Sequence, residues 1–231
     1  MKIFIALYLK ELKDARNLSC ILAIGTLVLQ GWVLLSVETL MIALFFSSLP
    51  LWAIMFVLPF LLASSFTGEW RGNTTYLLFA LPVRAAVVCL CKFAAIFSVG
   101  LMLFSVSGTG VYTVVARAPE EDVSQLLGFF GVTPGAVSAY TAGFLGSYAF
   151  LSLGIVSAAE GARYTAPRLR GLVTAASFVM CAIIYLTMAG YFVNGLLGSL
   201  PTGPALMAYT VFSGLVFLLI GLFLFEKFVE I

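Results

Sequence analysis

Six long apolar runs separated by short polar stretches restrict what this chain can fold into more than any other feature. A helix that crosses a bilayer needs about 20 apolar residues, and each run reaches that length. The runs cover roughly residues 18–37, 41–66, 85–115, 136–159, 171–193 and 205–225. We therefore predict an all-α, polytopic membrane protein with six transmembrane helices.

The composition excludes a water-soluble protein. Hydrophobic residues make up 62% of the chain and charged residues 10%, whereas a soluble domain carries about 25% charged residues. The excess apolar surface has to face lipid. We therefore expect a lipid membrane as one partner and no nucleic acid.

Metal and disulfide chemistry are not expected. The chain contains no histidine, and its four cysteines, Cys20, Cys89, Cys91 and Cys181, lie in or beside the apolar runs. Cysteine in such a position usually behaves as a small buried hydrophobic residue. The sequence therefore indicates neither a metal site nor a disulfide framework.

The positive charges predict the orientation, because cytoplasmic loops of membrane proteins carry an excess of lysine and arginine. With the N-terminus inside, Arg117 is the one basic residue of the twelve that falls outside. The other eleven are Lys2, Lys10, Lys13, Arg16, Arg71, Arg84, Lys92, Arg163, Arg168, Arg170 and Lys227. Both termini are therefore predicted to be cytoplasmic, in a multi-pass protein of the plasma membrane.

The N-terminal segment is predicted to be an interfacial helix that precedes a single membrane domain. Residues 1–16 alternate apolar and charged positions at helical spacing, with Tyr8 and Leu12 on one side and Lys13 on another. Such a helix is expected to lie in the membrane interface, with its lysines reaching anionic lipid. A positive anchor that fixes the topology is a compatible alternative. Residues 17–231 then form the six-helix domain.

The predicted span centres contain no ionisable residue, and this absence narrows the function. Glu69, Lys92 and Glu160 are expected at the cytoplasmic edges of their spans, where long side chains reach water cheaply. An ion-coupled carrier normally needs a titratable group at depth. The chain also lacks a G-x-x-x-x-G-K-[ST] phosphate loop. We therefore expect no enzyme activity in this chain, and any uphill transport would need energy from a partner.

The segment from Glu69 to Arg84 concentrates charge and turn-forming residues between two apolar runs. Thr74 is predicted to cap a short helix that Pro82 stops. A short, mostly apolar helix on the cytoplasmic face can fill a groove on a soluble partner. An ordinary re-entry loop on the membrane surface explains the same pattern and stays open.

This segment resembles the coupling loop of permeases of the ABC type-2 family. Those permeases carry an acidic residue, a Gly-Thr step, a leucine-rich run, a Leu-Pro pair, an arginine and a following lysine. The corresponding residues here are Glu69, Asn73-Thr74, Leu77-Leu78, Leu81-Pro82, Arg84 and Lys92. The chain departs from the pattern at Asn73, where glycine is usual, and at Arg84, which stands one residue nearer the proline.

The resemblance implies a permease subunit of an ABC exporter. Such a permease pairs with a second copy or a sister permease, binds a dimer of cytoplasmic ATPase subunits, and exports its substrate by alternating access. ATP and Mg are then expected in the partner ATPase. The loop at residues 67–84 would receive the ATPase stroke through Glu69, Arg71, Gly72, Thr74, Leu77, Leu78, Pro82 and Arg84. Haem-exporter B-type permeases share this pattern.

Aromatic and soft side chains are candidates for a substrate path. They are Trp52, Phe56 and Phe60, at helical spacing in the second run, and Met180, Tyr185 and Met188 in the fifth. In the family the second span helps line the central path, and an uncharged path favours an amphipathic substrate. Lipid-facing or packing aromatics are the alternative, because aromatic residues are common in any span.

A function without transport also stays open. A membrane assembly or immunity protein would share the topology but would need neither a substrate path nor ATP. Small residues in the fourth run, among them Gly146, Gly154 and Ala158, favour helix packing inside the chain over a dimer interface.

Overall fold

The chain folds into six long helices, each long and apolar enough to cross a membrane. The structure is a computed structural model, and it describes residues 2–37, 39–71, 84–119, 123, 134–165, 169–196 and 202–229. The helices are α1 (Lys2–Ser36), α2 (Leu40–Arg71), α4 (Ala85–Arg117), α6 (Pro134–Ala162), α7 (Arg170–Tyr191) and α8 (Thr202–Val229). The predicted all-α fold with six transmembrane helices is confirmed.

The first helix is longer than the apolar run that predicted it. α1 continues from Lys2 to Ser36 as one helix of 35 residues, so residues 1–16 and the first span are not separated by a break in the described backbone. Its first half carries the lysines, and its second half is apolar. The placement of residues 1–16 in the membrane interface stays a prediction.

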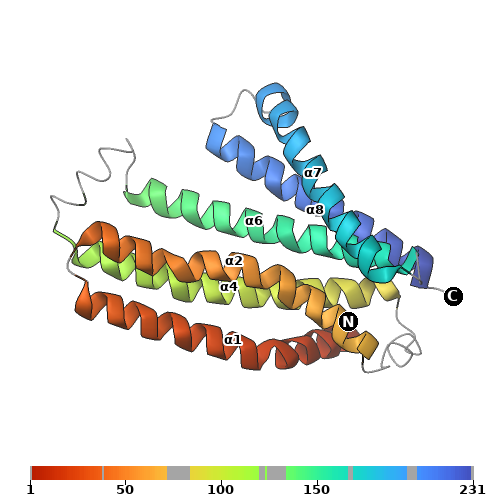
Figure 1. Cartoon of the computed structure of the whole chain (residues 1–231), viewed down its shortest axis with the longest axis horizontal. Helices are drawn as coiled ribbons and strands as arrows, with labels where there is room; N and C mark the ends of the chain where they lie inside the picture. The colour runs from red at the N-terminus through yellow and green to blue at the C-terminus, as the bar shows by residue number, and fades with distance from the viewer. Residues whose placement is uncertain are drawn as a thin grey trace.

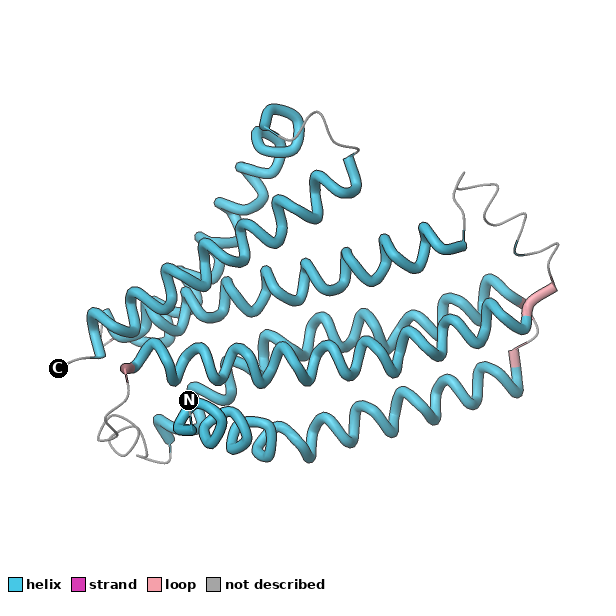
Figure 2. The backbone as a smooth tube through the Cα atoms, turned by 180° about the vertical axis from the view of Figure 1, so that it is seen from behind, coloured by secondary structure: helices cyan, strands magenta, loops and turns pink. Residues whose placement is uncertain are grey.

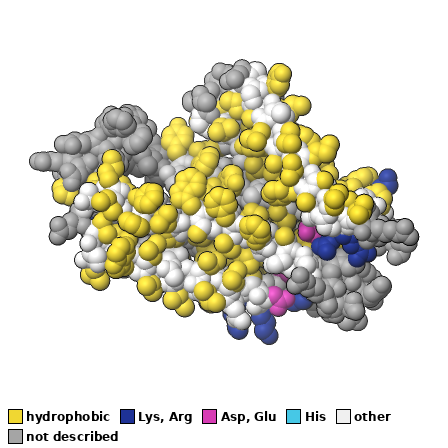
Figure 3. Space-filling view, in the orientation of Figure 1, with side chains coloured by type: hydrophobic (Ala, Val, Ile, Leu, Met, Phe, Trp, Pro, Cys, Tyr) yellow, Lys and Arg dark blue, Asp and Glu magenta, His cyan; other side chains and the backbone are white. Residues whose placement is uncertain are grey.

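The helices run back and forth, so that both chain ends lie at the same end of the bundle (Figure 1). Most of the Lys and Arg side chains visible in Figure 3 gather at this end. We call it the basic end; its described basic residues include Lys10, Lys13, Arg16, Arg84, Arg163, Arg170 and Lys227. Arg117 ends α4 at the opposite end. The separation of charge that the sequence predicted is therefore present in the fold.

α1, α2 and α4 lie side by side, whereas α7 and α8 diverge from them at the end opposite the basic end (Figures 1 and 2). The main core forms where α2, α4 and α6 meet, around Leu58, Ile96 and Leu153, which are at most 2% exposed. Phe150 of α6 meets Phe93 of α4 edge to face, with ring centroids 5.3 Å apart. This contact packs α6 against α4.

Glycines bring α6 and α8 into backbone contact. A Cβ atom added to Gly154 would lie 2.4 Å from the carbonyl oxygen of Gly214, and one added to Gly161 would lie 2.9 Å from that of Gly221. Helices in membranes approach this closely only where small residues face each other. The prediction that small residues of the fourth run pack inside the chain is confirmed for Gly154.

Candidate functional site

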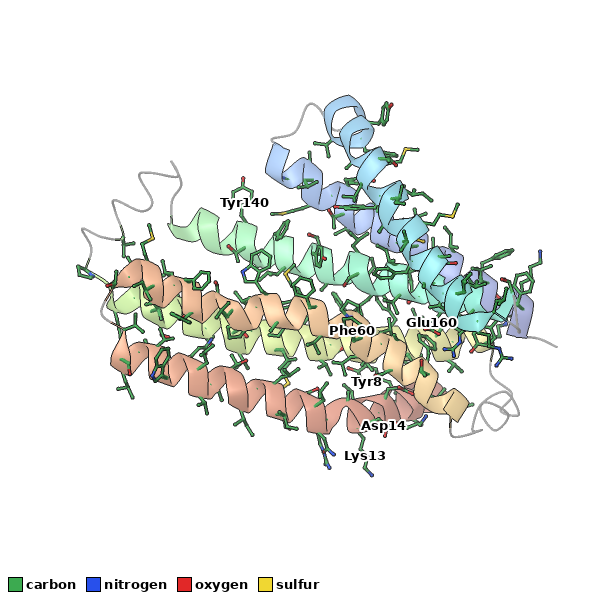
Figure 4. The ribbon with its side chains drawn as sticks, viewed as in Figure 1. Tyr8, Lys13, Asp14, Phe60, Tyr140 and Glu160 are labelled. Carbon is green, nitrogen blue, oxygen red and sulfur yellow. The ribbon has the colours of Figure 1, made fainter. Side chains whose placement is uncertain are left out.

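A glutamate occupies the inward face of α1 near the basic end. Leu7, Glu11, Ala15 and Ser19 succeed one another at intervals of four residues and are all buried, because residues at this spacing share one face of a helix. Glu11 is 5% exposed. By contrast, Lys13 points away from the bundle (Figure 4).

Lys92 of α4 provides the opposite charge. Its Nζ lies 2.8 Å from Oε1 of Glu11 and also donates to Oγ of Ser65, on α2, at 3.1 Å. The Ser65 hydroxyl donates in turn to Oε2 of Glu11 at 3.2 Å. Lys92 is 1% exposed, and its Nζ lies 5.5 Å from the centre of the Phe66 ring. Glu11, Ser65 and Lys92, which we call the polar latch, thus join three helices through buried charge-assisted contacts.

The polar latch lines one wall of a pocket. The pocket has a volume of about 240 Å³ and is lined by Lys10, Glu11, Asp14, Ala15, Leu61, Ser64, Ser65, Gly68, Lys92 and Ile96. Lys10, whose side chain is 45% exposed, places its Nζ 3.5 Å from Oε1 of Glu11. The pocket therefore gives the buried pair a polar neighbourhood on one side and an apolar one on the other.

A second buried carboxylate lies near the basic end, in the last turn of α6 (Figure 4). Glu160 is 3% exposed, and its Oε2 accepts a hydrogen bond from NH1 of Arg163 at 3.2 Å. The same NH1 group donates to Oγ1 of Thr67, on α2, at 3.4 Å. Because Thr67 stands two residues after Ser65, the basic end of α2 is tied to both α1 and α6.

Sequence reasoning was wrong about the surroundings of Lys92 and Glu160. It placed both side chains where they reach water, whereas the structure buries both because each has a charged partner within 3.2 Å. It missed Glu11 and Ser65 altogether. The available signal was the register of Glu11 with Leu7, Ala15 and Ser19, which puts it on the packed face of α1. Its partner, 81 residues further along the chain, carries no such local signal.

The predicted coupling residues lie mostly outside the described residues. Gly72, Thr74, Leu77, Leu78 and Pro82 belong to this group, as do the side chains of Glu69 and Arg71, whose backbone forms the last turn of α2. Arg84 precedes the first residue of α4, and its side chain is 78% exposed. Its NH1 lies 4.0 Å from Oε1 of Glu226 on α8. Their role as coupling residues stays a prediction.

The predicted path residues occupy different surfaces of the chain. Trp52, Phe56 and Phe60 form one exposed row on α2, whereas Met180 and Met188 are exposed on α7. Tyr185 turns toward α8, where its ring stacks on Tyr209 and its hydroxyl lies 2.9 Å from Oγ1 of Thr210. Their role in a substrate path stays a prediction.

Among the residues that the structure describes, no three histidine, cysteine or acidic side chains lie close enough to hold a metal ion. Cys89 and Cys91 are free thiols, and each is 1% exposed. The polar latch is therefore the most distinctive chemical group in the described fold.

Comparisons of the chain with protein-family models, with curated proteins and with solved structures gave no match. The fold establishes a polytopic membrane protein with six helices long enough to span a bilayer. These comparisons assign no family, and the resemblance described above rests on the sequence pattern from Glu69 to Lys92.

Proposed function

We propose that this chain is the transmembrane subunit of an ATP-binding-cassette exporter, driven by a separate cytoplasmic ATPase. The observation that carries the proposal is the position of the polar latch. α2 ends and α4 begins at the basic end (Figure 1), with residues 72–83 between them in the sequence. The buried contacts of Ser65 and Lys92 tie these two helices together near those ends. A partner that pushes on this connection would therefore act on helices that the polar latch joins to α1.

The residue pattern from Glu69 to Lys92 supports the same proposal. Lys92, the last residue of the resemblance, is the cation of the polar latch. The acidic residue Glu69 belongs to the last turn of α2 and this lysine to α4, the two helices that would receive the stroke of the ATPase.

Pairing of two permeases would supply the substrate path. The exposed row of Trp52, Phe56 and Phe60 on α2 presents aromatic rings outward from the single chain. Facing a second copy or a sister permease, these rings form an apolar wall that suits an amphipathic substrate. ATP and Mg are assigned to the partner ATPase, because this chain lacks a phosphate loop.

Co-purification from the native membrane tests the proposal. A tagged copy expressed at native level is extracted in mild detergent, and the co-eluting proteins are identified by mass spectrometry. We expect a stoichiometric ATPase with Walker motifs, which is lost when Glu69 and Arg71 are replaced by alanine. Recovery with non-ATPase partners only would overturn the proposal and favour a membrane assembly or immunity protein.

A further inference from the structure

We infer that the polar latch opens and closes, and that it passes movement of α2 and α4 to the N-terminal half of α1. The driving force rests on the proposed function, because it comes from the ATPase. The latch itself is a property of this chain alone. Glu11 and Lys92 act as positioning residues, since neither needs to touch a substrate.

The distance to the 72–83 connection makes such transmission direct. Ser65 stands six residues before Arg71 at the end of α2, and Lys92 stands seven residues after Ala85 at the start of α4. At a helical rise of about 1.5 Å per residue, both lie roughly 10 Å from their helix ends. A tilt imposed on either end therefore reaches the latch through less than about three helical turns.

The polar latch joins the first half of α1 to α4 through charged groups. Tyr8 also donates a hydrogen bond to Ser98 of α4 at 2.9 Å, and Leu7 packs in a small apolar cluster with Val88 and Cys91. These contacts are neutral. In the second half of α1, Gln30 donates to the carbonyl oxygen of Ser107 at 2.9 Å. Loss of the latch would therefore loosen the first half of α1, which keeps these neutral contacts, while Gln30 holds the second.

The surroundings of the latch make opening reversible. Lys10 lies 3.5 Å from Glu11 on the same helix, so the carboxylate keeps a cation when α1 moves away from α4. Lys92 keeps its hydrogen bonds to the hydroxyl and the carbonyl oxygen of Ser65, at 3.1 and 3.3 Å. The adjoining pocket of about 240 Å³ provides polar surroundings for both groups. Glu11 thus keeps a cation and Lys92 keeps its hydrogen bonds to Ser65, which lowers the cost of separating a buried pair.

Cys91 is a built-in reporter for the separation of α1 from α4. It precedes Lys92, it is 1% exposed, and its Sγ lies 3.6 Å from the carbonyl oxygen of Phe4 on α1. The thiol is therefore covered by α1 while the latch is closed. When α1 moves away, a small reagent such as N-ethylmaleimide gains access to it.

The first experiment measures the rate at which Cys91 is labelled in the full chain in lipid vesicles, with Cys20, Cys89 and Cys181 replaced by alanine. We expect Glu11→Gln to raise the labelling rate at least about tenfold. The charge-swapped double variant Glu11→Lys/Lys92→Glu should return it close to that of the parent chain. Lys13→Gln, on the exposed face of the same helix, is the matched control and should leave it unchanged.

Equal labelling of the parent chain and of a folded Glu11→Gln variant would overturn the latch. Folding is checked by circular dichroism and by gel filtration in detergent. If Glu11→Gln fails to fold, the parent chain and the charge-swapped variant are compared instead. Slow labelling of both supports the latch, because the swapped chain again joins α1 to α4 through opposite charges, and fast labelling of the swapped chain contradicts it.

The second experiment adds the ATPase partner and nucleotide. In the parent complex we expect ATP to change the labelling rate of Cys91, and Glu11→Gln to abolish that change together with transport while ATP hydrolysis continues. Continued ATP hydrolysis by the folded Glu11→Gln complex separates loss of transmission from loss of stability, and the charge-swapped variant should restore transport. If ATP leaves the labelling rate of Cys91 unchanged in a complex that transports, the latch stays closed during transport, and the inference is overturned. Failure to find any ATPase overturns the proposed function instead, and the outcome of the first experiment stands.

Discussion

Two ion pairs in this bundle place the same kinds of groups in opposite environments. Glu11 and Lys92 have side chains that are 6% and 1% exposed, whereas those of Arg84 and Glu226 are 78% and 45% exposed. Desolvation makes a buried charge dependent on its partner. Water screens an exposed pair, which therefore contributes little to stability.

Loss of the buried pair should lower the free energy of unfolding more than loss of the exposed pair. Glu11→Gln leaves the Lys92 charge buried without its carboxylate, and we expect a loss of about 3–5 kcal/mol. Arg84→Gln is the exposed control and should cost less than about 1 kcal/mol. The double variant Glu11→Leu/Lys92→Met removes both charges and should recover most of the loss. Denaturant unfolding in mild detergent measures all three, and equal effects of the two single variants would contradict the burial of the pair.

Gly110 makes room for a buried polar side chain. A Cβ atom at this position would overlap the amide carbon of Gln30, 1.8 Å away. Gln30 is 4% exposed and uses this space to donate to the Ser107 carbonyl oxygen at 2.9 Å. The glycine is therefore required by its neighbour on α1 rather than by its own backbone.

Gly110→Ala should displace Gln30 and destabilise the fold by about 1–3 kcal/mol, through overpacking and a lost hydrogen bond. Gly108→Ala is the matched control, since nothing lies within 4 Å of its added Cβ on the same helix. Adding Gln30→Ala to the Gly110→Ala variant should relieve the clash. Thermal unfolding in detergent provides the comparison, and identical melting of the two alanine variants would refute the packing.

At the residue scale, the sequence predicted which side chains share a face wherever helical spacing within one apolar run determines that face. Trp52, Phe56 and Phe60 were predicted to share a face, and the structure exposes all three on one row of α2. Glu11 could not be placed in this way. Its burial depends on Lys92, which folding brings within 2.8 Å from 81 residues away.

At the scale of elements, α6 and α8 form one unit because glycines on each helix lie against the backbone of the other. Gly154 and Gly161 of α6 face Gly214 and Gly221 of α8, and an added Cβ at any of the four would come within 3.0 Å of backbone atoms of the opposite helix. Backbone cannot move aside as a side chain can. The pair is therefore expected to tolerate no side chain at these positions.

Gly154→Ala should push α6 away from α8 and cost about 1–3 kcal/mol of stability. The control is Gly146→Ala on the same helix, where nothing lies within 4 Å of the added Cβ. That variant should be neutral or slightly stabilising, because alanine favours a helix over glycine by about 1 kcal/mol. Thermal unfolding of the two variants in the same detergent decides between these outcomes, and equal melting temperatures would rule out the glycine contact.

The elements themselves were predictable because hydropathy alone identifies long apolar runs. Their ends were less so. Residues 1–16 and the first run were predicted as two elements, yet α1 continues as one helix from Lys2 to Ser36, since a helix continues through polar residues wherever one face stays packed. The fifth run was predicted to reach residue 193, whereas α7 ends at Tyr191 and a π-helix follows from Phe192 to Leu196.

At the scale of the whole molecule, the fold places both chain ends and most described basic residues at one end (Figures 1 and 3). This arrangement agrees with the charge distribution from which the topology was predicted. The gathering of basic residues at one end was predictable because it depends on a sum over many residues. The polar latch was not, because it depends on the mutual register of three helices.

Single cysteines test the topology in intact cells. In a chain without its native cysteines, we expect a membrane-impermeant maleimide to label Arg117→Cys, at the predicted outer end. The same reagent should label Lys13→Cys, on the exposed face of α1, only after the cells are opened. The reverse pattern would show the opposite orientation.

The short helix α7 has a consequence for how the molecule meets bilayers of different thickness. It has 22 residues, whereas the other five helices have 28 to 35 residues. At a rise of about 1.5 Å per residue, α7 is about 33 Å long. None of its residues is buried, so packing holds its angle only weakly. In a thick, sterol-rich membrane α7 has to stand upright to span the hydrocarbon layer, whereas in a thin one it can lean. We expect the distance between spin labels on α7 and α8 to change with the acyl-chain length of the lipid. A constant distance would show that the angle of α7 is fixed.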